Sequence, residues 1–272
     1  MKPLSSWPIA ARRRVIGVFT DIDDTLTTLG AITPDALQAL ADLKAAGLQV
    51  IPITGRPIGW CAPFARGDSV AGITPWPVDA IVAENGAVAF ARSPTGVPSK
   101  LYQQPEAVRS SNFARMQQVA AGVLRAVPGT LLSQDSPGRE TDIAIDHSEF
   151  THLPPEQITR VVQLMQSAGM TATVSSIHVN GWFGDHNKLE GARWIVRALF
   201  NRSLNDEIDQ WAYVGDSTND QIMFQHFSNS VGVANIRRFE TELSHPPRFV
   251  SPSERGAGFA EVARAILQAR HP

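Results

Sequence analysis

The sequence predicts an α/β protein with a three-layer core around a mainly parallel sheet, interrupted by an inserted α+β segment. Short apolar runs at residues 15–20, 48–53, 79–83 and 210–214 each end abruptly in polar residues, which is typical of buried parallel strands. Helical patterns separate several of these runs, as expected for right-handed βαβ crossovers. From residue 88 to 183 the pattern changes to alternating strands, helices and Pro/Gly-rich turns, which predicts a small antiparallel sheet covered on one face.

Each element has its own signal along the chain. Thr33-Pro34 opens a helix and Gly47 ends it, because Thr suits the N-cap, Pro the first turn and Gly the residue after the helix. The insertion holds predicted helices at 111–126 and 155–168 and strands at 141–146, 170–174 and 176–182. An amphipathic helix at 188–200, short strands at 230–234 and 248–250, and a helix at 258–270 complete the chain. We therefore expect a core in two parts, 1–87 and 184–272, with a cap domain at 88–183.

The amino-acid composition limits which binding partners and which cellular compartment are expected for this protein. The 272 residues carry a formal net charge of -2, with 43% hydrophobic and 18% charged residues, so neither nucleic acid nor an acidic membrane is the expected partner. No apolar run approaches the length of a membrane span. Cys61 is the single cysteine, so no intrachain disulfide can form and a reducing, cytoplasmic compartment is expected. The oligomeric state is left open.

Polar clusters follow three of the predicted strands: Asp21/Asp23, Thr54, and the segment Asp216 to Asp220. Ligands bind outside the carboxyl ends of strands in open parallel sheets, so these clusters are expected to share one crevice. Asp21 and Asp23 lie two apart and face the same side. Carboxylates gathered in one place need a cation, and an all-oxygen set at a phosphate site favours Mg²⁺.

The same residue types suit phosphoryl transfer, which depends mainly on positioning and charge neutralisation. One carboxylate can form an aspartyl-phosphate and the second can move protons. Thr54 and Lys188 are candidates to hold phosphoryl oxygens, since Lys188 opens a helix whose N–H groups also favour an anion. Taken singly, an Asp-x-Asp turn, a Thr-Gly-Arg turn and a helical lysine are each ordinary structural features. Their order along one chain favours catalysis.

These motifs resemble those of the haloacid dehalogenase superfamily of phosphohydrolases. The match comprises Asp21-Ile-Asp-Asp-Thr-Leu26, Ile53-Thr-Gly-Arg56, Lys188 and Gly215-Asp-Ser-Thr-Asn-Asp220. The insertion between the second and third motifs resembles the subfamily IIB proteins, with a Rossmann-like core and a type C2B cap. That group includes Cof-type sugar phosphatases, sucrose-phosphate phosphatases and mannosyl-3-phosphoglycerate phosphatases.

The resemblance implies a role for each matched residue. Asp21 would be the nucleophile and a Mg²⁺ ligand, and Asp23 the general acid/base with its main-chain carbonyl on the metal. Thr54 and Lys188 would bind the phosphoryl group, and Asp216 would be a direct metal ligand. Two further residues would support the metal or its waters: Asn219 and Asp220. One departure is Asp24, where many relatives have glycine.

Substrate selectivity is expected from the cap and from the strand ends beneath it. The candidate substrate-binding residues are Gly55, Arg56, Asn85, Arg139, Glu140, His178 and Asn180; the alternative for the cap residues is a purely structural role inside a small sheet. The predicted function is a magnesium-dependent phosphatase acting on a small phosphorylated metabolite, with a sugar phosphate or phosphorylated glycoside favoured by the resemblance. The alternatives are a phosphomutase of sugar phosphates and a non-catalytic binding module on the same scaffold.

Overall fold

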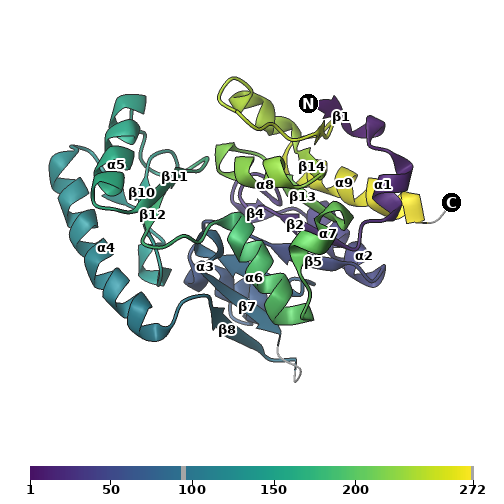
Figure 1. Ribbon diagram of the computed structural model, residues 1–272, viewed down its shortest axis with the longest axis horizontal. Coiled ribbons are helices and arrows are strands. Elements are labelled where there is room, and N and C mark those ends of the chain that lie inside the picture. Colours follow the sequence, from purple (N-terminus) through teal and green to yellow (C-terminus); the bar gives the residue numbers. More distant parts are fainter. Residues whose placement is uncertain (93–95, 271–272) are drawn as a thin grey trace.

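A six-stranded sheet lies at the centre of the computed structural model, which describes residues 1–92 and 96–270 (Figure 1). All of its paired strands run parallel. Its order is β1 (Lys2–Pro3), β15 (Phe249–Val250), β14 (Asn229–Gly232), β13 (Trp211–Gly215), β2 (Gly17–Thr20) and β5 (Gln49–Pro52). Strands from the two ends of the sequence, β2 and β13, are neighbours, so the loops that follow them meet at one edge.

Helices cover both faces of this sheet, and each face has its own apolar core. On one face lie α1 (Ile9–Arg13), α2 (Pro34–Ala45), α3 (Ile58–Arg66) and α9 (Arg255–Arg270). On the other lie α6 (Lys188–Phe200), α7 (Leu204–Glu207) and α8 (Gln221–His226). The predicted three-layer α/β architecture is confirmed. Because both faces of the sheet are buried, its strands need apolar residues at nearly every position, as the sequence shows.

A second sheet continues the core beyond β5. The antiparallel strands β6 (Ala80–Ala83), β7 (Val88–Arg92) and β8 (Pro98–Tyr102) form it, and a parallel bridge between Ile53 and Val82 joins it to the end of β5. The residues after 87 thus extend the core-side sheet. The division of the chain into 1–87, 88–183 and 184–272 stays a prediction, and this pairing leads us to propose that the cap begins near Gln103.

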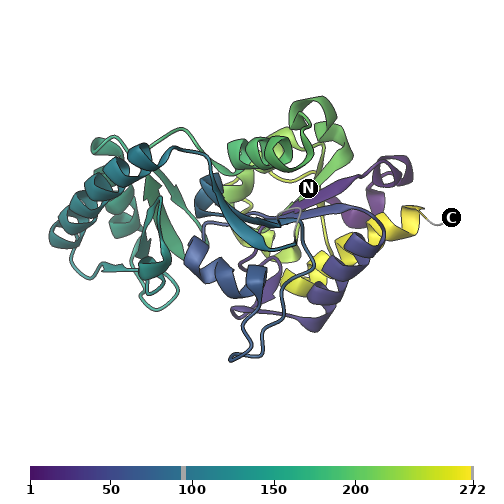
Figure 2. The same ribbon diagram turned by 90° about the horizontal axis from the view of Figure 1, so that it is seen from below.

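The inserted segment forms an antiparallel sheet with two helices. The strand order is β11 (Thr171–Val174), β12 (His178–Trp182), β10 (Ile143–Asp146) and β9 (Leu131–Leu132). The helices α4 (Glu106–Ala126) and α5 (Pro155–Ser167) share an apolar core with this sheet. Figure 2 shows this α+β unit beside the larger sheet, with both chain termini on the side of the larger sheet.

Local sequence signals account for most element boundaries. Helix α2 begins at Pro34 after the extended Thr33 and ends before Gly47, whose φ is +79°. A small hairpin of β3 (Thr27–Thr28) and β4 (Ala31–Ile32) lies between β2 and α2. None of the helices in residues 1–92 and 96–270 is both long and apolar enough to cross a lipid bilayer.

Candidate active site

The structure brings three acidic side chains together at the carboxyl end of the parallel sheet. Asp21 directly follows β2 and Asp216 directly follows β13, and the Asp21 N–H donates to the Val214 carbonyl at 2.8 Å. One carboxylate oxygen from each of Asp21, Asp216 and Asp220 lies within 4.8 Å of the others, and all three residues are buried. The neighbouring positions of β2 and β13 therefore create the acidic cluster, although Asp21 and Asp216 are 195 positions apart in the sequence.

Lys188 enters this cluster from the first turn of α6. The Asn187 side chain caps that helix by accepting hydrogen bonds from the N–H groups of Leu189 and Glu190 at 2.9 and 3.0 Å. The Lys188 Nζ then lies 2.9 Å from Asp21 Oδ1 and 2.7 Å from Asp220 Oδ1, and the residue is 2% exposed. Two of its three N–H donors are engaged by these carboxylates, so one remains for a ligand.

Asp220 organises the cluster through four contacts. Its Oδ1 accepts from Lys188 and from the Tyr213 hydroxyl, and its Oδ2 accepts from the main-chain N–H groups of Asp216 and Ser217 at 2.9 and 3.2 Å. The carboxylate lies against Gly215, where a Cβ atom would come within 2.4 Å of Oδ2. Asp220 thus fixes both the loop that carries Asp216 and the lysine.

Asp216 is held by two neutral donors. The Thr25 hydroxyl donates to its Oδ1 at 3.2 Å, and the Asn235 amide donates to its Oδ2 at 3.0 Å. Asn235 itself is fixed by the main-chain N–H of Arg255 at the start of α9. Because Asp216 and Asp21 face each other across the β2–β13 edge, their remaining lone pairs point into the same space.

The charges of the cluster do not balance. Three carboxylates and one lysine leave two negative charges in a buried site. Burial raises the pKa of Asp21 to about 7, even though Lys188 lowers it, and burial together with Asp21 and Asp220 raises the pKa of Asp216 well above its usual range. One divalent cation would supply the two missing charges. Hard oxygen ligands of this kind suit Mg²⁺, so the residues fit the predicted ion.

Asp23 lies on the same loop as Asp21, and Thr54 follows the neighbouring strand β5 at the same edge. Thr54 follows β5, is 1% exposed, and accepts a hydrogen bond from the Arg56 N–H at its Oγ1 at 3.0 Å. The Asp23 carboxylate is held by Arg56, with Nε at 3.1 and 3.0 Å from its two oxygens and Nη2 at 3.0 Å from Oδ1. Paired N–H donors of this kind fix the orientation of a carboxylate.

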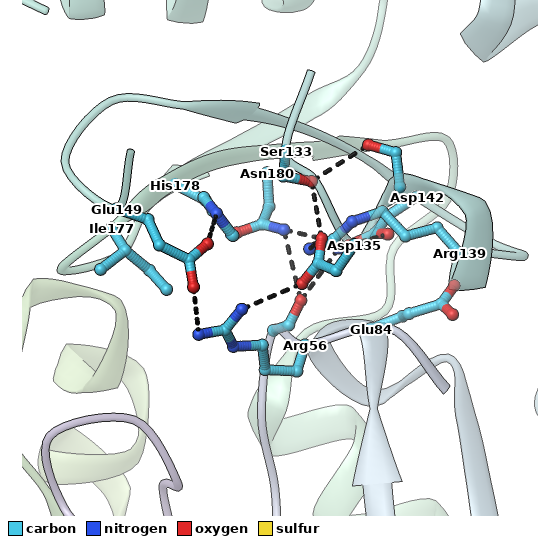
Figure 3. A network of polar contacts seen from close by, with 12 residues as sticks. Arg56, Glu84, Ser133, Asp135, Arg139, Asp142, Glu149, Ile177, His178 and Asn180 are labelled. Atoms are coloured by element: carbon cyan, nitrogen blue, oxygen red, sulfur yellow. Dashed lines mark hydrogen bonds and ion pairs between the residues drawn. The ribbon is translucent and has the colours of Figure 1, made fainter. Parts of the chain in front are cut away.

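Arg56 also connects the core to the inserted unit, as Figure 3 shows. Its Nη1 lies 3.1 Å from Asp135 Oδ2 and its Nη2 lies 2.8 Å from Glu149 Oε1. His178 lies 2.8 Å from the other Glu149 oxygen. Three carboxylates from three separate segments therefore share one guanidinium that is 7% exposed.

Other predicted substrate-binding residues support the loop of Thr54 rather than the acidic cluster. The Arg139 Nη1 and the Asn180 Nδ2 both donate to the Gly55 carbonyl, at 3.0 and 3.3 Å, and both contact Asp142. Glu140 instead contacts Lys100 and the Tyr102 hydroxyl of β8. The direct substrate contacts predicted for these cap residues stay predictions.

Asn85 and Asn219 occupy positions close to Lys188. Asn85 is 3% exposed, has a φ of +54° and has no hydrogen-bond partner for its Nδ2 among residues 1–92 and 96–270. Asn219 accepts a hydrogen bond from the Ser217 hydroxyl at 2.8 Å. All three residues line one cavity next to the acidic cluster.

The sequence and fold also match known proteins. Residues 18–111 match the family described as haloacid dehalogenase-like hydrolases. A Thermoplasma acidophilum protein of the same fold has a TM-score of 0.68 and 17% identity, with 93% of this chain and 98% of that chain covered. The chain therefore resembles haloacid dehalogenase-like hydrolases over these residues and shares the fold of the Thermoplasma protein.

Two further similar structures are sugar phosphatases. The sucrose-phosphatase of Synechocystis, solved with sucrose and phosphate, has a TM-score of 0.65, 14% identity, and 93% and 98% coverage of the two chains. A haloacid dehalogenase subclass IIB sugar phosphatase has a TM-score of 0.60, 15% identity and the same coverage of 93% and 98%. No curated protein has a significantly similar sequence.

Asp24 departs from the glycine found in many haloacid dehalogenase relatives, and the structure shows how the loop accommodates it. Its φ is +53°, a left-handed conformation that glycine adopts more easily. Aspartate tolerates this region better than most residues, and the Asp24 carboxylate lies 2.9 Å from the Arg255 guanidinium. Arg255 thus balances the additional charge of the loop that carries Asp21.

Sequence reasoning missed several residues that hold this site together. They are Thr25, Glu84, Asp135, Glu149, Tyr213 and Asn235. Glu84 had a signal, since it precedes Asn85-Gly86 at a strand end, and its buried carboxylate accepts main-chain hydrogen bonds from Ile58, Glu140 and Thr141. Thr25 lies within the first motif and Tyr213 within the apolar strand β13, while Asp135, Glu149 and Asn235 lie in polar segments. Only the spatial neighbours of these five residues reveal their contacts.

Proposed function

We propose that the protein is a Mg²⁺-dependent phosphatase that hydrolyses a small phosphate monoester through an aspartyl-phosphate on Asp21. The observation that carries the proposal is the buried cluster of Asp21, Asp216 and Asp220 with Lys188, which has two negative charges in excess. Such a cluster costs stability unless a cation neutralises it. A cation-loaded carboxylate site with an adjacent lysine suits phosphoryl transfer.

The residues divide the reaction between them. An Asp21 carboxylate oxygen attacks phosphorus and the ester P–O bond breaks, while Asp23 gives its proton to the departing oxygen. Asp23 then takes a proton from water, whose oxygen attacks phosphorus and releases the Asp21 carboxylate together with inorganic phosphate. Bound Mg²⁺ would be held by Asp21, Asp216 and the Asp23 carbonyl, and would supply charge neutralisation for the phosphoryl oxygens.

Lys188 and Thr54 would orient the transferred group. The third N–H of Lys188, at the start of α6, and the Thr54 hydroxyl, after β5, both lie at the carboxyl edge of the sheet. The Lys188 pair with Asp21 lowers the pKa of this carboxylate and so opposes the larger effect of burial, which raises it. Asn219 and Asp220 support the loop that carries Asp216.

For the substrate we propose a small phosphorylated metabolite, with a sugar phosphate favoured. The similarity to a sucrose-phosphatase and a subclass IIB sugar phosphatase supports this choice. The inserted unit would select the substrate, since β11 faces the Lys188 cavity and Arg56 contacts Asp135 and Glu149. The predicted cytoplasmic location remains a prediction from the single cysteine.

The test is phosphate release by the purified protein. A panel of sugar phosphates, phosphorylated hydroxy acids, acetyl phosphate and p-nitrophenyl phosphate should give inorganic phosphate with Mg²⁺ and none with EDTA. Asp21→Asn should abolish turnover while leaving the fold intact, because the change is nearly isosteric. Rapid acid quenching of a reaction with ³²P-labelled substrate should trap label on the wild-type protein and not on the variant.

Two outcomes would contradict the proposal in different ways. Retention of labelled phosphate on a second hydroxyl of the sugar would indicate a phosphomutase. Absence of any Mg²⁺-stimulated release from every ester would indicate a binding module that uses the same scaffold.

A further inference from the structure

The Gly55 carbonyl lies where the core meets the inserted unit. The carbonyls on either side of it, those of Thr54 and Arg56, each accept a main-chain hydrogen bond at 3.0 Å from the core turn at residues 84–85. The Gly55 carbonyl instead accepts two hydrogen bonds from side chains of the inserted unit. The loop that carries Thr54 is therefore held by the core on one side and by the inserted unit on the other.

The two donors to this carbonyl are Arg139 and Asn180. The Arg139 Nη1 lies 3.0 Å from the Gly55 oxygen, and the Asn180 Nδ2 lies 3.3 Å from it. Both side chains also contact the Asp142 carboxylate, Arg139 at 2.8 and 2.9 Å and Asn180 at 3.3 Å (Figure 3). All three side chains belong to residues that are no more than 5% exposed. Asp142 thus holds both donors against a single carbonyl.

A buried carboxylate of the core fixes the segment that carries Arg139. Glu84 is 0% exposed, and its Oε2 accepts a hydrogen bond from the Glu140 N–H at 3.0 Å. One residue before Arg139, Gly138 packs against Gly59, where a Cβ atom would come within 2.7 Å of the Gly138 Cα. The segment can therefore not move away from the core without taking hydrogen bonds from a buried carboxylate, which is costly.

The Gly55–Arg56 peptide transmits this contact to Thr54. A peptide unit is planar and rigid, so fixing its carbonyl also fixes the direction of its N–H. That N–H belongs to Arg56 and donates to the Thr54 Oγ1 at 3.0 Å. A hydroxyl oxygen that accepts this bond must direct its own proton elsewhere, and the proton can then reach a phosphoryl oxygen. The contacts at the Gly55 carbonyl thus set the orientation of the Thr54 hydroxyl.

We propose that Arg139 and Asn180 are positioning residues for phosphoryl transfer, which act through the Gly55 carbonyl to orient the Thr54 hydroxyl. The proposal rests on the phosphatase function proposed above. Thr54 would bind the phosphoryl group, which every ester shares, so the inserted unit completes the site for all esters alike. Direct substrate contacts by the same two residues would instead affect only those esters whose leaving group reaches them.

The first experiment measures kcat and KM of the Mg²⁺-loaded protein for acetyl phosphate, p-nitrophenyl phosphate and glucose 6-phosphate. Asn180→Leu removes one donor at similar size. The paired variant Arg139→Met/Asp142→Leu removes the other, because replacing both partners of a buried ion pair by apolar residues preserves stability better than removing one. The leaving groups of acetyl phosphate and p-nitrophenyl phosphate depart without a proton, so these two esters report on the phosphoryl group independently of Asp23.

We expect kcat/KM to fall by the same factor for all three esters. The factor should be about 3- to 10-fold for Asn180→Leu, which loses a neutral donor, and about 10- to 100-fold for the paired variant, which loses a charged one. Inhibition by orthovanadate, which takes the place of the transferred phosphoryl group, should weaken by a similar factor.

The matched control is Val161→Ala, because Val161 of α5 is buried in the apolar core of the inserted unit. This variant should lower the melting temperature and leave kcat/KM within about twofold of the wild type, which separates loss of stability from loss of positioning. Circular dichroism checks the fold of every variant. If the paired variant does not fold, Asn180→Leu alone decides the result.

The second experiment places Asn180→Leu in a Thr54→Val background. Valine has the shape of threonine without the hydroxyl, so the connection from the Gly55 carbonyl to the phosphoryl group is interrupted. Asn180→Leu should then change kcat/KM by less than about twofold, because substitutions that act through the same group are not additive. A purely structural role of Asn180 would give the same fall in both backgrounds.

The outcomes distinguish this inference from the function beneath it. A loss of activity confined to glucose 6-phosphate would indicate direct substrate contact and overturn the positioning role. An unchanged kcat/KM in the folded variants, or an equal fall in the Thr54→Val background, would also overturn it, while hydrolysis by the wild type still supported a phosphatase. Absence of hydrolysis of every ester by the wild type would overturn both.

Discussion

Asp220→Asn tests the claim that Asp220 holds the site together rather than binding the ion. The carboxylate accepts four hydrogen bonds, from Lys188, Tyr213 and the N–H groups of Asp216 and Ser217. Asparagine keeps one oxygen, so its NH₂ group must face two donors. Removing one partner of a buried ion pair lowers the unfolding free energy by about 3–5 kcal/mol. We take this figure to include the loss of the hydrogen bonds from the main-chain N–H groups of Asp216 and Ser217.

We expect the unfolding free energy of Asp220→Asn to fall by about 3–5 kcal/mol in Mg²⁺-free buffer. Urea unfolding followed by fluorescence should show a lower midpoint at an unchanged slope. Turnover should fall about 100-fold, because Lys188 and the Asp216 loop lose their common anchor. Asp206→Asn, at an exposed position of α7, is the matched control and should stay within about 0.5 kcal/mol of the wild type.

A change below about 1 kcal/mol for Asp220→Asn would refute the assignment of Asp220 as the central acceptor. Asp21→Asn provides the contrast, since it removes one carboxylate of the overcharged cluster and leaves Lys188 paired with Asp220. In Mg²⁺-free buffer its unfolding free energy should not fall below that of the wild type by more than about 1 kcal/mol, although its activity is lost. Equal destabilisation by the two substitutions would contradict the distinction between the two aspartates.

Three further changes probe the backbone, the charges and the cap contact. Gly191→Ala should lower the unfolding free energy by about 2 kcal/mol or more, because its Cβ would lie 2.5 Å from the Gly86 Cα. The control Gly122→Ala, in open space on α4, should raise the unfolding free energy by about 0.5–1 kcal/mol. Similar urea midpoints for the two variants would contradict this prediction. In Mg²⁺-free buffer, wild-type stability relative to Asp21→Asn should fall as pH rises from about 4 to about 7, by at most about 1.4 kcal/mol per pH unit. Burial raises the pKa of Asp21 to about 7 in the folded protein, so the folded state keeps a proton that the unfolded state releases at lower pH. A difference in unfolding free energy between the two proteins that does not change with pH would contradict this explanation. Glu149→Gln, which weakens the contacts to Arg56 and His178, should raise KM for a sugar phosphate about fivefold, corresponding to about 1 kcal/mol; an unchanged KM would mean that the Arg56 contact has no part in substrate binding.

The contacts of Arg56 give the inserted unit a direct connection to the proposed proton donor. Asp23 is oriented by the same guanidinium that contacts Asp135 and Glu149. Movement of the inserted unit would change the partners of Arg56 and thereby the surroundings of Asp23. Closure of such a unit also excludes water from the phosphoryl group.

The sequence alone determined the architecture because strongly apolar strands and amphipathic helices have few ways to bury both faces of a sheet. Asp21, Thr54 and Asp216 could be predicted as site residues because they follow those strands, and ligands bind at the carboxyl edge of a parallel sheet. Lys188 was found by its place at the start of a helix and by its motif. These features depend on residues that are close together in the sequence, so they can be recognised without the structure.

Only the tertiary structure decided which polar groups are free and which are engaged. Arg139, Glu140, His178 and Asn180 are equally polar in the sequence, yet most of their contacts go to Gly55, Asp142, Glu149 and β8. The Asn85 Nδ2 and the Thr173 Oγ1 have no hydrogen-bond partner within residues 1–92 and 96–270. Hydrogen bonding is short-range and directional, so its outcome depends on side-chain positions that strand and helix patterns leave undetermined.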